Sequence, residues 1–138
     1  MKNDLSETSK LAKFKHTIEV KPEHIDELGH VNNVVYLGWV QLVAATHWNK
    51  LSTIEIRSKN IWVALRHEID YLNPAYFGDE ITAYTWVSSH DGAKSVRHVE
   101  FYKEEKCIAK AKTVWCLLDA TTLKPKRIGE DIKILLET

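Results

Sequence analysis

The feature that most limits how this chain can fold is residues 33 to about 50, a long segment with no acidic side chain. Two asparagines stand at its start, and asparagine commonly caps helices, so we predict one long helix here. Its apolar residues are Val34, Val35, Tyr36, Leu37, Trp39, Val40, Leu42, Val43, Ala44, Ala45 and Trp48. They lie on nearly every side of the helix, so the rest of the protein must enclose it.

Most of the remaining chain is predicted to form long strands. Five segments have the alternation or the β-branched and aromatic side chains typical of strands: residues 14–20, 61–72, 79–89, 93–103 and 107–119. The turns at 91–92 and 104–106 are short, so the strands that they join should pair as antiparallel hairpins. A short helix is expected at 129–137. Strands of this length suit an α+β fold in which a strongly twisted sheet wraps around the apolar helix.

The length and the charge of the chain narrow its class. Its 138 residues suit one domain, which we expect at residues 13–138 after a flexible polar tail at residues 1–12. Lys and Arg together number 19, as do Asp and Glu, so the formal net charge is zero. A chain without a basic surplus is a poor candidate for binding nucleic acid.

The N-terminus and the cysteines indicate a cytoplasmic protein. The first ten residues lack the apolar stretch of a signal peptide, and no apolar run is long enough to span a bilayer. Cys107 and Cys116 lie too far apart along one predicted strand to form a disulfide, and free thiols fit a reducing compartment. No cysteine or histidine stands at metal-ligand spacing beside either, so we expect no metal and no cofactor.

The segment just ahead of the predicted helix carries the strongest chemical signal. Asp26 places a carboxylate before a helix N-terminus, where the first amides have no acceptor within the helix. Such amides stabilise an oxyanion, while a nearby carboxylate can attack a carbonyl or activate water. Gly29 allows a close approach of the backbone to a ligand, or a positive φ. The same residue types are common in turns and caps, so spacing alone leaves both interpretations open.

A twelve-residue motif spans this loop and the helix start. It reads Asp26-x-x-Gly29-His30-Val31-Asn32-Asn33-x-x-Tyr36-Leu37. The motif resembles the signature of the 4-hydroxybenzoyl-CoA thioesterase-like family of hotdog-fold proteins, and is similar to the acyl-CoA and plant acyl-ACP thioesterases. The resemblance continues through the strands at 68–75 and 106–119 and covers residues 14 to about 135. It implies a hotdog fold, in which a long antiparallel sheet wraps around one central helix, and hydrolysis of a thioester.

The resemblance also implies roles for individual residues. Asp26 matches the family's catalytic aspartate, and the backbone amide of Asn33 matches the group that polarises the thioester carbonyl. Tyr36 matches a recurrent aromatic residue on the first helical turn, which is structural or lines the pocket. His30 matches the histidine that plant acyl-ACP thioesterases are thought to use.

This sequence departs from two related patterns. The plant motif has Asn where this chain has Leu28, which favours a mechanism built on Asp26 alone over one that uses Asp, Asn and His together. A second hotdog subclass places its catalytic Glu on the central helix, but residues 31–54 contain neither Asp nor Glu. Asp26 is therefore the carboxylate nearest the helix start.

Further residues are expected to bind the substrate. Gly29, Asn32 and Tyr36 belong to the motif. Trp62 and Val63 begin a strand that, in hotdog dimers, passes the partner's active site, so Trp62 lines the acyl pocket or is part of the core. Four cations either meet CoA phosphates or keep a strand edge soluble: Lys94, Arg97, Lys110 and Lys112.

The resulting hypothesis is a cytoplasmic acyl-CoA thioesterase that binds neither nucleic acid nor membrane. Because a lone hotdog protomer has an open sheet edge, the resemblance implies a homodimer or homotetramer. Three alternatives stay open: an acyl-ACP thioesterase, a hotdog protein that binds an acyl thioester without hydrolysing it, and a hotdog dehydratase or isomerase. The last usually pairs a His with an acid in a different motif, which this sequence lacks. The aromatic residues suit an aromatic or a fatty acyl group equally.

Overall fold

The computed structural model describes residues 13–138, so the predicted N-terminal tail at residues 1–12 lies outside the described part. The elements in chain order are β1 (Phe14–Glu19), η1 (Pro22–His24), α2 (Asn33–Leu51), α3 (Ile54–Lys59), β2 (Asn60–Tyr71), β3 (Glu80–Asp91), β4 (Lys94–Lys103), β5 (Lys106–Asp119) and α4 (Glu130–Leu136). The predicted long helix, five strands and C-terminal helix are confirmed, with ends that differ by one or two residues. The short helix α3 was not predicted.

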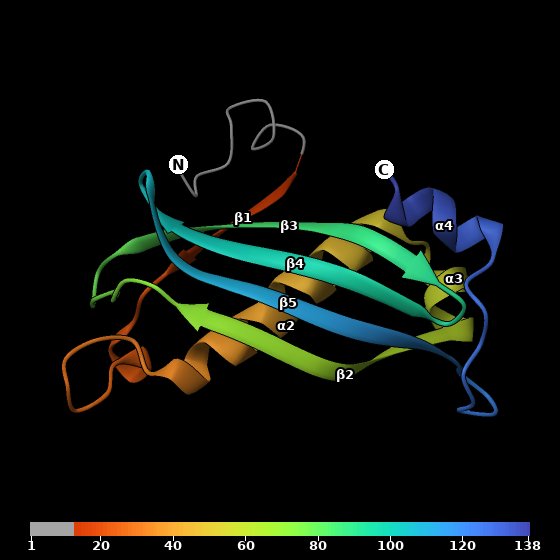
Figure 1. Cartoon of the computed structure of the whole chain (residues 1–138), viewed down its shortest axis with the longest axis horizontal. Coiled ribbons are helices and arrows are strands. Elements are labelled where there is room, and N and C mark those ends of the chain that lie inside the picture. Colours follow the sequence, from red (N-terminus) through yellow and green to blue (C-terminus); the bar gives the residue numbers. More distant parts are fainter. Residues whose placement is uncertain (1–12) are drawn as a thin grey trace.

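The five strands form one antiparallel sheet in the order β1-β3-β4-β5-β2. The hairpins β3–β4 and β4–β5 are confirmed, and β2 pairs with β5 at one edge. Figure 1 shows the sheet curving across α2, which crosses behind the strands. The predicted α+β architecture, with a long twisted antiparallel sheet around one helix, is therefore confirmed.

Three irregularities in the strand pairing help these long strands to bend, and one of them lies between Phe101 and Tyr102 in the pairing of β4 with β5. The pairing of β2 with β5 shifts between Ala64 and Arg66, and that of β3 with β4 shifts between Val87 and Ser89. An extra residue on one strand of a pair increases the local twist and bends that strand. Strands of 12 residues in β2 and β3 can then follow the curve of the sheet around α2.

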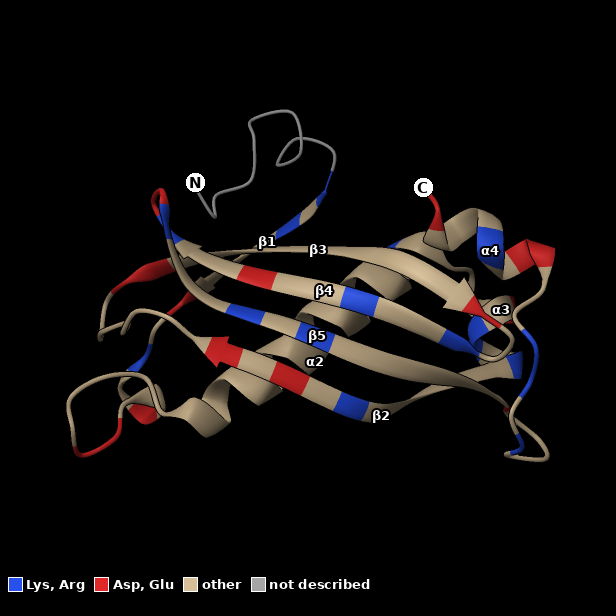
Figure 2. Ribbon diagram, viewed as in Figure 1, with Lys and Arg blue, Asp and Glu red and all other residues tan. Residues whose placement is uncertain are grey.

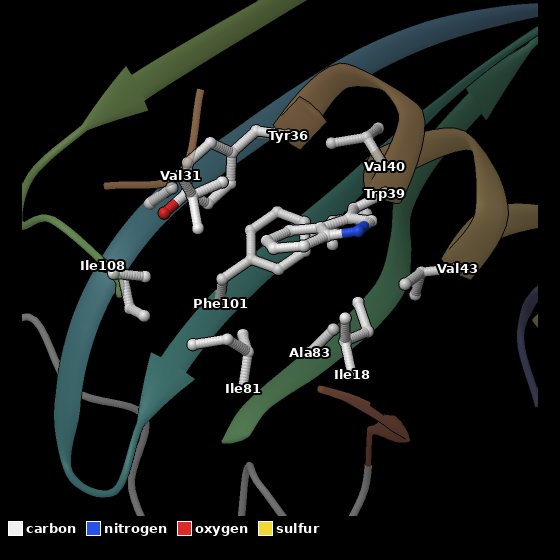
Figure 3. Packing of buried hydrophobic residues seen from close by; sticks show 14 of the residues in the cluster. Ile18, Val31, Tyr36, Trp39, Val40, Val43, Ile81, Ala83, Phe101 and Ile108 are labelled. Carbon is white, nitrogen blue, oxygen red and sulfur yellow. The ribbon is translucent and has the colours of Figure 1, made fainter. Parts of the chain in front are cut away.

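One side of α2 packs against the inner face of the sheet. Tyr36, Trp39, Val40 and Val43 recur at the spacing of one helix face, and all four are buried. Phe101 of β4 is fully buried beneath them, with its ring centroid 5.7 Å from that of Tyr36 and 6.1 Å from that of Trp39. Figure 3 shows these rings meeting in the centre of the cluster. The first turns of α2 are thus fixed to the sheet by aromatic packing.

The opposite side of α2 is not enclosed, which corrects the expectation from its composition. Val34 is 74% exposed, Leu42 is 48% exposed and Leu37 is 36% exposed. Figure 2 shows that α2 carries no charge along most of its length, so this outer side is uncharged as well as exposed. The sheet of one protomer covers only one side of the helix, and an apolar stripe is left facing outward.

Within residues 13–138, no helix combines the length and the apolar character that crossing a bilayer requires.

Candidate active site

The loop between η1 and α2 folds back on itself as a tight turn. A bridge joins Ile25 to Val31, and the N–H of Asp26 donates to the carbonyl of His30 at 3.0 Å. Gly29 lies inside this turn with a φ of +88°, which glycine adopts readily and other residues rarely do. The turn therefore keeps the backbone of Asp26 next to that of His30, and the positive φ expected for Gly29 is confirmed.

The carboxylate of Asp26 is oriented by the same turn. Its Oδ1 accepts a hydrogen bond from the N–H of Leu28 at 2.9 Å. Within residues 13–138 its Oδ2 has no hydrogen-bond partner, and the residue is partly exposed. One oxygen thus holds the carboxylate in place, while the other is available to attack a carbonyl or to accept a proton.

The start of α2 is capped by one asparagine rather than two. Asn32 Oδ1 accepts from the N–H of Val34 at 2.8 Å, and the Asn32 carbonyl accepts from the N–H of Val35 at 2.9 Å. Asn33 is the first helical residue, so the expectation that its side chain also caps the helix was wrong. Among residues 13–138, no acceptor meets the N–H of Asn33. This amide is left unpaired at the positive end of the helix dipole.

The backbone of Asn33 is also held from the sheet side, through its carbonyl. Tyr71, the last residue of β2, donates its hydroxyl hydrogen to the Asn33 carbonyl at 3.2 Å. The preceding residues are held too, because the N–H of Val31 donates to the carbonyl of Ala75 at 2.9 Å. The unpaired amide therefore sits on a part of the backbone that is restrained from both sides.

An open pocket of about 270 Å³ lies beside this helix start. We call it the helix-start pocket, and it is lined by His30, Val31, Asn33, Tyr36, Tyr71, Leu72, Asn73 and Pro74. Three residues that the motif singled out, His30, Asn33 and Tyr36, meet at its wall. Gly29 and Asn32 adjoin these residues in the chain without lining the pocket, and Asp26 does not line it either.

Tyr36 is held in its neutral form. Burial is the main reason that the pKa of its phenol rises to about 12, and the charges of Tyr71 and Asp79 add to the increase. Its ring packs edge-on against Tyr71, with centroids 5.6 Å apart, as well as against the core. A phenol that stays protonated cannot act as a base at neutral pH, so Tyr36 shapes the pocket and anchors the helix.

Two residues expected to bind substrate lie elsewhere in the protomer. Trp62 and Val63 are near the start of β2, whereas Tyr71 at its other end reaches the helix-start pocket. Tyr71 lies nine positions after Trp62 along the strand, which is about 30 Å. Within one protomer the structure therefore does not bring Trp62 or Val63 to the helix start.

Trp62 instead lines a second pocket of about 130 Å³ near the C-terminal half of α2. We call it the indole pocket, because three tryptophans are among its lining residues Gln41, Ala44, Ala45, Trp48, Trp62, Ser95, Arg97, Trp115 and Leu136. The rings of Trp48 and Trp62 meet edge to face, with centroids 5.8 Å apart.

Arg97 was placed wrongly as a cation that meets CoA phosphates or keeps a strand edge soluble. It is only 5% exposed, and its guanidinium lies between α2 and the sheet. The signal was present in the alternation of β4, because Arg97 shares its side of the strand with Val99 and Phe101, which are both buried. The alternation was overlooked because Arg97 is charged, and arginine is seldom fully buried.

Cysteine and metal chemistry find no support in the described residues. Cys107 and Cys116 are both free and buried, and burial is the main reason that the pKa of the Cys107 thiol is raised. A raised pKa disfavours the thiolate, which is the nucleophilic form. No cluster of three or more metal-binding side chains occurs between residues 13 and 138.

Sequence comparison relates most of the chain to one family. Residues 20–136 match the model of the thioesterase-like superfamily. A comparison with curated proteins gave no match.

Solved structures of similar fold agree with this match. The YbaW probable thioesterase from Escherichia coli is 20% identical, with a TM-score of 0.80 over 89% of this chain and 96% of that one. Slr0204, a 1,4-dihydroxy-2-naphthoyl-CoA thioesterase from Synechocystis, is 13% identical, with a TM-score of 0.78 over 91% and 96% of the two chains. A thioesterase from Thermus thermophilus, complexed with coenzyme A and Zn, is 24% identical, with a TM-score of 0.79 over 89% and 90%. These similarities confirm the predicted hotdog fold.

Proposed function

Because this chain belongs to the thioesterase-like superfamily, we propose that it hydrolyses an acyl-CoA to a free acid and CoA-SH. Family and fold support thioesterase activity in general. The choice of CoA as the carrier is supported by a structural neighbour that was solved in complex with coenzyme A and by another named as a 1,4-dihydroxy-2-naphthoyl-CoA thioesterase. Acyl carrier protein is the alternative carrier.

The observation that carries this proposal is the unpaired amide of Asn33 at the wall of the helix-start pocket. A thioester carbonyl docked there accepts a hydrogen bond from this N–H at the positive end of α2. The interaction strengthens as negative charge develops on the oxygen, so it stabilises the tetrahedral transition state more than the substrate. The bond from Tyr71 to the Asn33 carbonyl restrains the peptide that follows, and so limits movement of the residue that carries this N–H.

Asp26 supplies the second half of the proposed reaction. As a nucleophile, its free Oδ2 attacks the thioester carbon, the C–S bond breaks, and the CoA thiolate leaves with the electron pair and then takes a proton. Water hydrolyses the resulting anhydride to the acid and regenerates the carboxylate. As a general base, Asp26 instead accepts a proton from the water that attacks the thioester. Either route needs one carboxylate oxygen that is oriented and one that is free.

His30 and the neighbouring backbone complete the proposed site. His30 lines the helix-start pocket and is proposed to donate a proton to the leaving thiolate. The backbone at Gly29 and Asn32 is proposed to border the bound thioester, and Tyr36 to form the floor beneath it.

We propose a homodimer that completes this site, or a homotetramer built from such dimers. Among the described strands, the edge strand β2 has a partner on one side only, and its Leu65 is 54% exposed. An antiparallel pairing of two β2 strands about their centres would place Trp62 and Val63 of one protomer near Tyr71 of the other. The pocket walls of the acyl group would then come from both chains.

The assembly is tested by light scattering on the purified chain. We expect a mass of at least about twice 15.9 kDa. Leu65→Lys should lower the mass toward the monomer, because a lysine on a pairing edge disfavours strand addition. The matched control, Thr17→Lys, introduces the same charge on the opposite edge strand β1 and should keep the wild-type mass. A fully active monomer would contradict the shared site.

The activity itself is tested by release of free thiol from short-chain, long-chain and aromatic acyl-CoAs. We expect release far above the uncatalysed rate for at least one class, and the preferred class identifies the acyl group. If no CoA ester reacts, the same assay is repeated with esters of acyl carrier protein. Release from these esters would mean that acyl carrier protein, and not CoA, is the carrier. Binding of an acyl thioester without turnover in either series would replace hydrolysis by a binding function.

A further inference from the structure

Arg97, in β4, is a buried cation that the proposed reaction does not use. Arg97 Nη1 donates hydrogen bonds to Nδ1 of His47 at 2.9 Å and to Oγ1 of Thr85 at 3.0 Å. Thr85 in turn donates its hydroxyl hydrogen to the carbonyl of His98 at 2.7 Å. Among residues 13–138, neither partner of the guanidinium is a carboxylate.

The partners of Arg97 are both neutral acceptors. Arginine has no lone pair to offer, so Nδ1 of His47 must accept, and the proton of the neutral imidazole then lies on Nε2. Burial and then the charge of Arg97 lower the pKa of His47 to about 4, which keeps the ring uncharged at neutral pH. Burial also lowers the pKa of Arg97, but only to about 10, so the guanidinium stays protonated. The interior therefore holds one positive charge without a negative partner in the described residues.

An uncompensated buried charge is costly, and this one lies at the wall of a cavity. Arg97 lines the indole pocket together with Trp115, and the buried indole Nε1 of Trp115 has no acceptor among residues 13–138. Among the described residues that line this pocket, Arg97 alone is charged, and most of the others are apolar. Arg97, which carries a cationic donor, and Trp115, which carries an unpaired indole N–H, thus both line the same small space.

The size and the walls of the indole pocket limit what it can hold. Its volume of about 130 Å³ is close to the roughly 150 Å³ of an apolar cavity that binds benzene. Trp48 and Trp62 give it flat aromatic walls, which suit a ring or a short apolar chain. An inorganic anion would satisfy Arg97 but would leave these walls without apolar contacts.

We propose that the indole pocket binds a small organic carboxylate. Its oxygens accept hydrogen bonds from Arg97 and from Nε1 of Trp115, and its apolar body lies against Trp48 and Trp62. The carboxylate supplies the missing negative charge, and charge-assisted bonds to a guanidinium are the strong kind. This binding site goes beyond the proposed hydrolysis, although it shares Trp62, which in the proposed dimer also lies near Tyr71 of the other protomer.

The test follows the indole N–H signals of ¹⁵N-labelled protein during titration with benzoate. The chain has five tryptophans, and Trp115→Phe identifies the signal of Trp115 by its loss. Benzoate should shift this signal to saturation in the millimolar range, because the N–H gains a carboxylate acceptor. Benzamide, which has the same ring without the charge, should shift it much less.

Two arginine variants separate this site from general anion binding. Arg97→Gln should weaken benzoate binding by at least about tenfold, since it removes the cation. Arg66→Gln removes an exposed arginine of β2 and should leave the titration unchanged. The remaining indole signals report whether Arg97→Gln keeps the fold. If Arg97→Gln does not fold, benzoate binding by Trp115→Phe is measured instead, and it should be weaker than that of the wild type.

Three results would overturn the proposal: no shift with benzoate, equal shifts with benzoate and benzamide, or undiminished binding by folded Arg97→Gln. Thioester hydrolysis is measured separately. A chain that binds benzoate but hydrolyses no thioester would contradict the proposed function and still support the carboxylate site. A chain that hydrolyses a thioester but does not bind benzoate would support the proposed function and contradict the carboxylate site.

Discussion

Asp26→Asn should lower the rate of thioester hydrolysis by about 10²–10⁴-fold, the range lost when a positioned acid–base group is removed. The amide cannot accept a proton from water and is a far poorer nucleophile than the carboxylate. The loss should fall mainly on kcat, because the Asn33 amide and the helix-start pocket are untouched and still bind the thioester. The measurement is thiol release at saturating acyl-CoA by wild type and variant.

The substitution is chosen because the structure predicts that it preserves the loop. Asn has the same shape as Asp, and its side-chain oxygen can still accept the hydrogen bond from the N–H of Leu28. The backbone bonds that close the turn, such as the one from the Gly29 N–H to the Asp26 carbonyl, do not involve the side chain. Thermal unfolding of the variant should therefore match that of the wild type.

The neighbouring carboxylate provides the matched control. Glu27→Gln makes the same chemical change one residue along the chain, at an exposed position that does not line the helix-start pocket. Its hydrolysis rate should stay within about twofold of the wild type, which corresponds to less than about 0.5 kcal/mol. Equal rates for wild type, Asp26→Asn and Glu27→Gln would show that Asp26 only shapes the turn.

Much of the fold could be predicted because local patterns decide it. The turns at Gly92 and around Glu104 are so short that the strands on either side must pair as antiparallel hairpins. Asn32 caps α2 as its residue type suggests, and Gly29 takes the positive φ that few other residues tolerate. These features depend on neighbours within a few residues, which the sequence displays directly.

Other features depend on contacts between distant segments and were missed. Arg97 was expected at a solvent-exposed edge, but His47 of α2 and Thr85 of β3 turn its guanidinium inward. The prediction for Trp62 is of another kind, because it named the partner's acyl pocket or the core: within one chain Trp62 lies beside Trp48 at the far end of β2, and its place in a dimer stays a prediction. Composition alone also could not show that Val34 of α2 is exposed, because this depends on which side of the helix the sheet covers.

Only part of the candidate site could be predicted, because some of its residues come from segments that are distant in the sequence. Through its resemblance to the thioesterase signature, the motif predicts Asp26, His30 and Asn33 as site residues, and their catalytic roles stay predictions. It did not identify Tyr71, which lies 38 residues beyond Asn33 and donates to its carbonyl. A hydrogen bond between an edge strand and a helix start becomes visible only when the topology brings the two together.

Phe101→Ala should lower the free energy of unfolding by about 3–5 kcal/mol, the usual cost of removing a buried aromatic ring. Phe101 is fully buried where β4 faces α2, and it contacts both Tyr36 and Trp39. The loss combines the burial of apolar surface with the cavity that remains between the helix and the sheet. Urea denaturation at one fixed protein concentration measures it, because assembly would make the midpoint concentration-dependent.

The control for this change is Phe77→Ala, which removes the same ring from a side chain that is 65% exposed. It should alter the free energy of unfolding by less than about 0.5 kcal/mol. Phe101→Leu keeps most of the apolar volume and should recover most of the loss. Similar values for Phe101→Ala and Phe77→Ala would mean that α2 is not fixed to the sheet through this ring. The restraint on the first turn of α2, and with it the orientation of the Asn33 amide, would then have to come from Tyr71 and the loop alone.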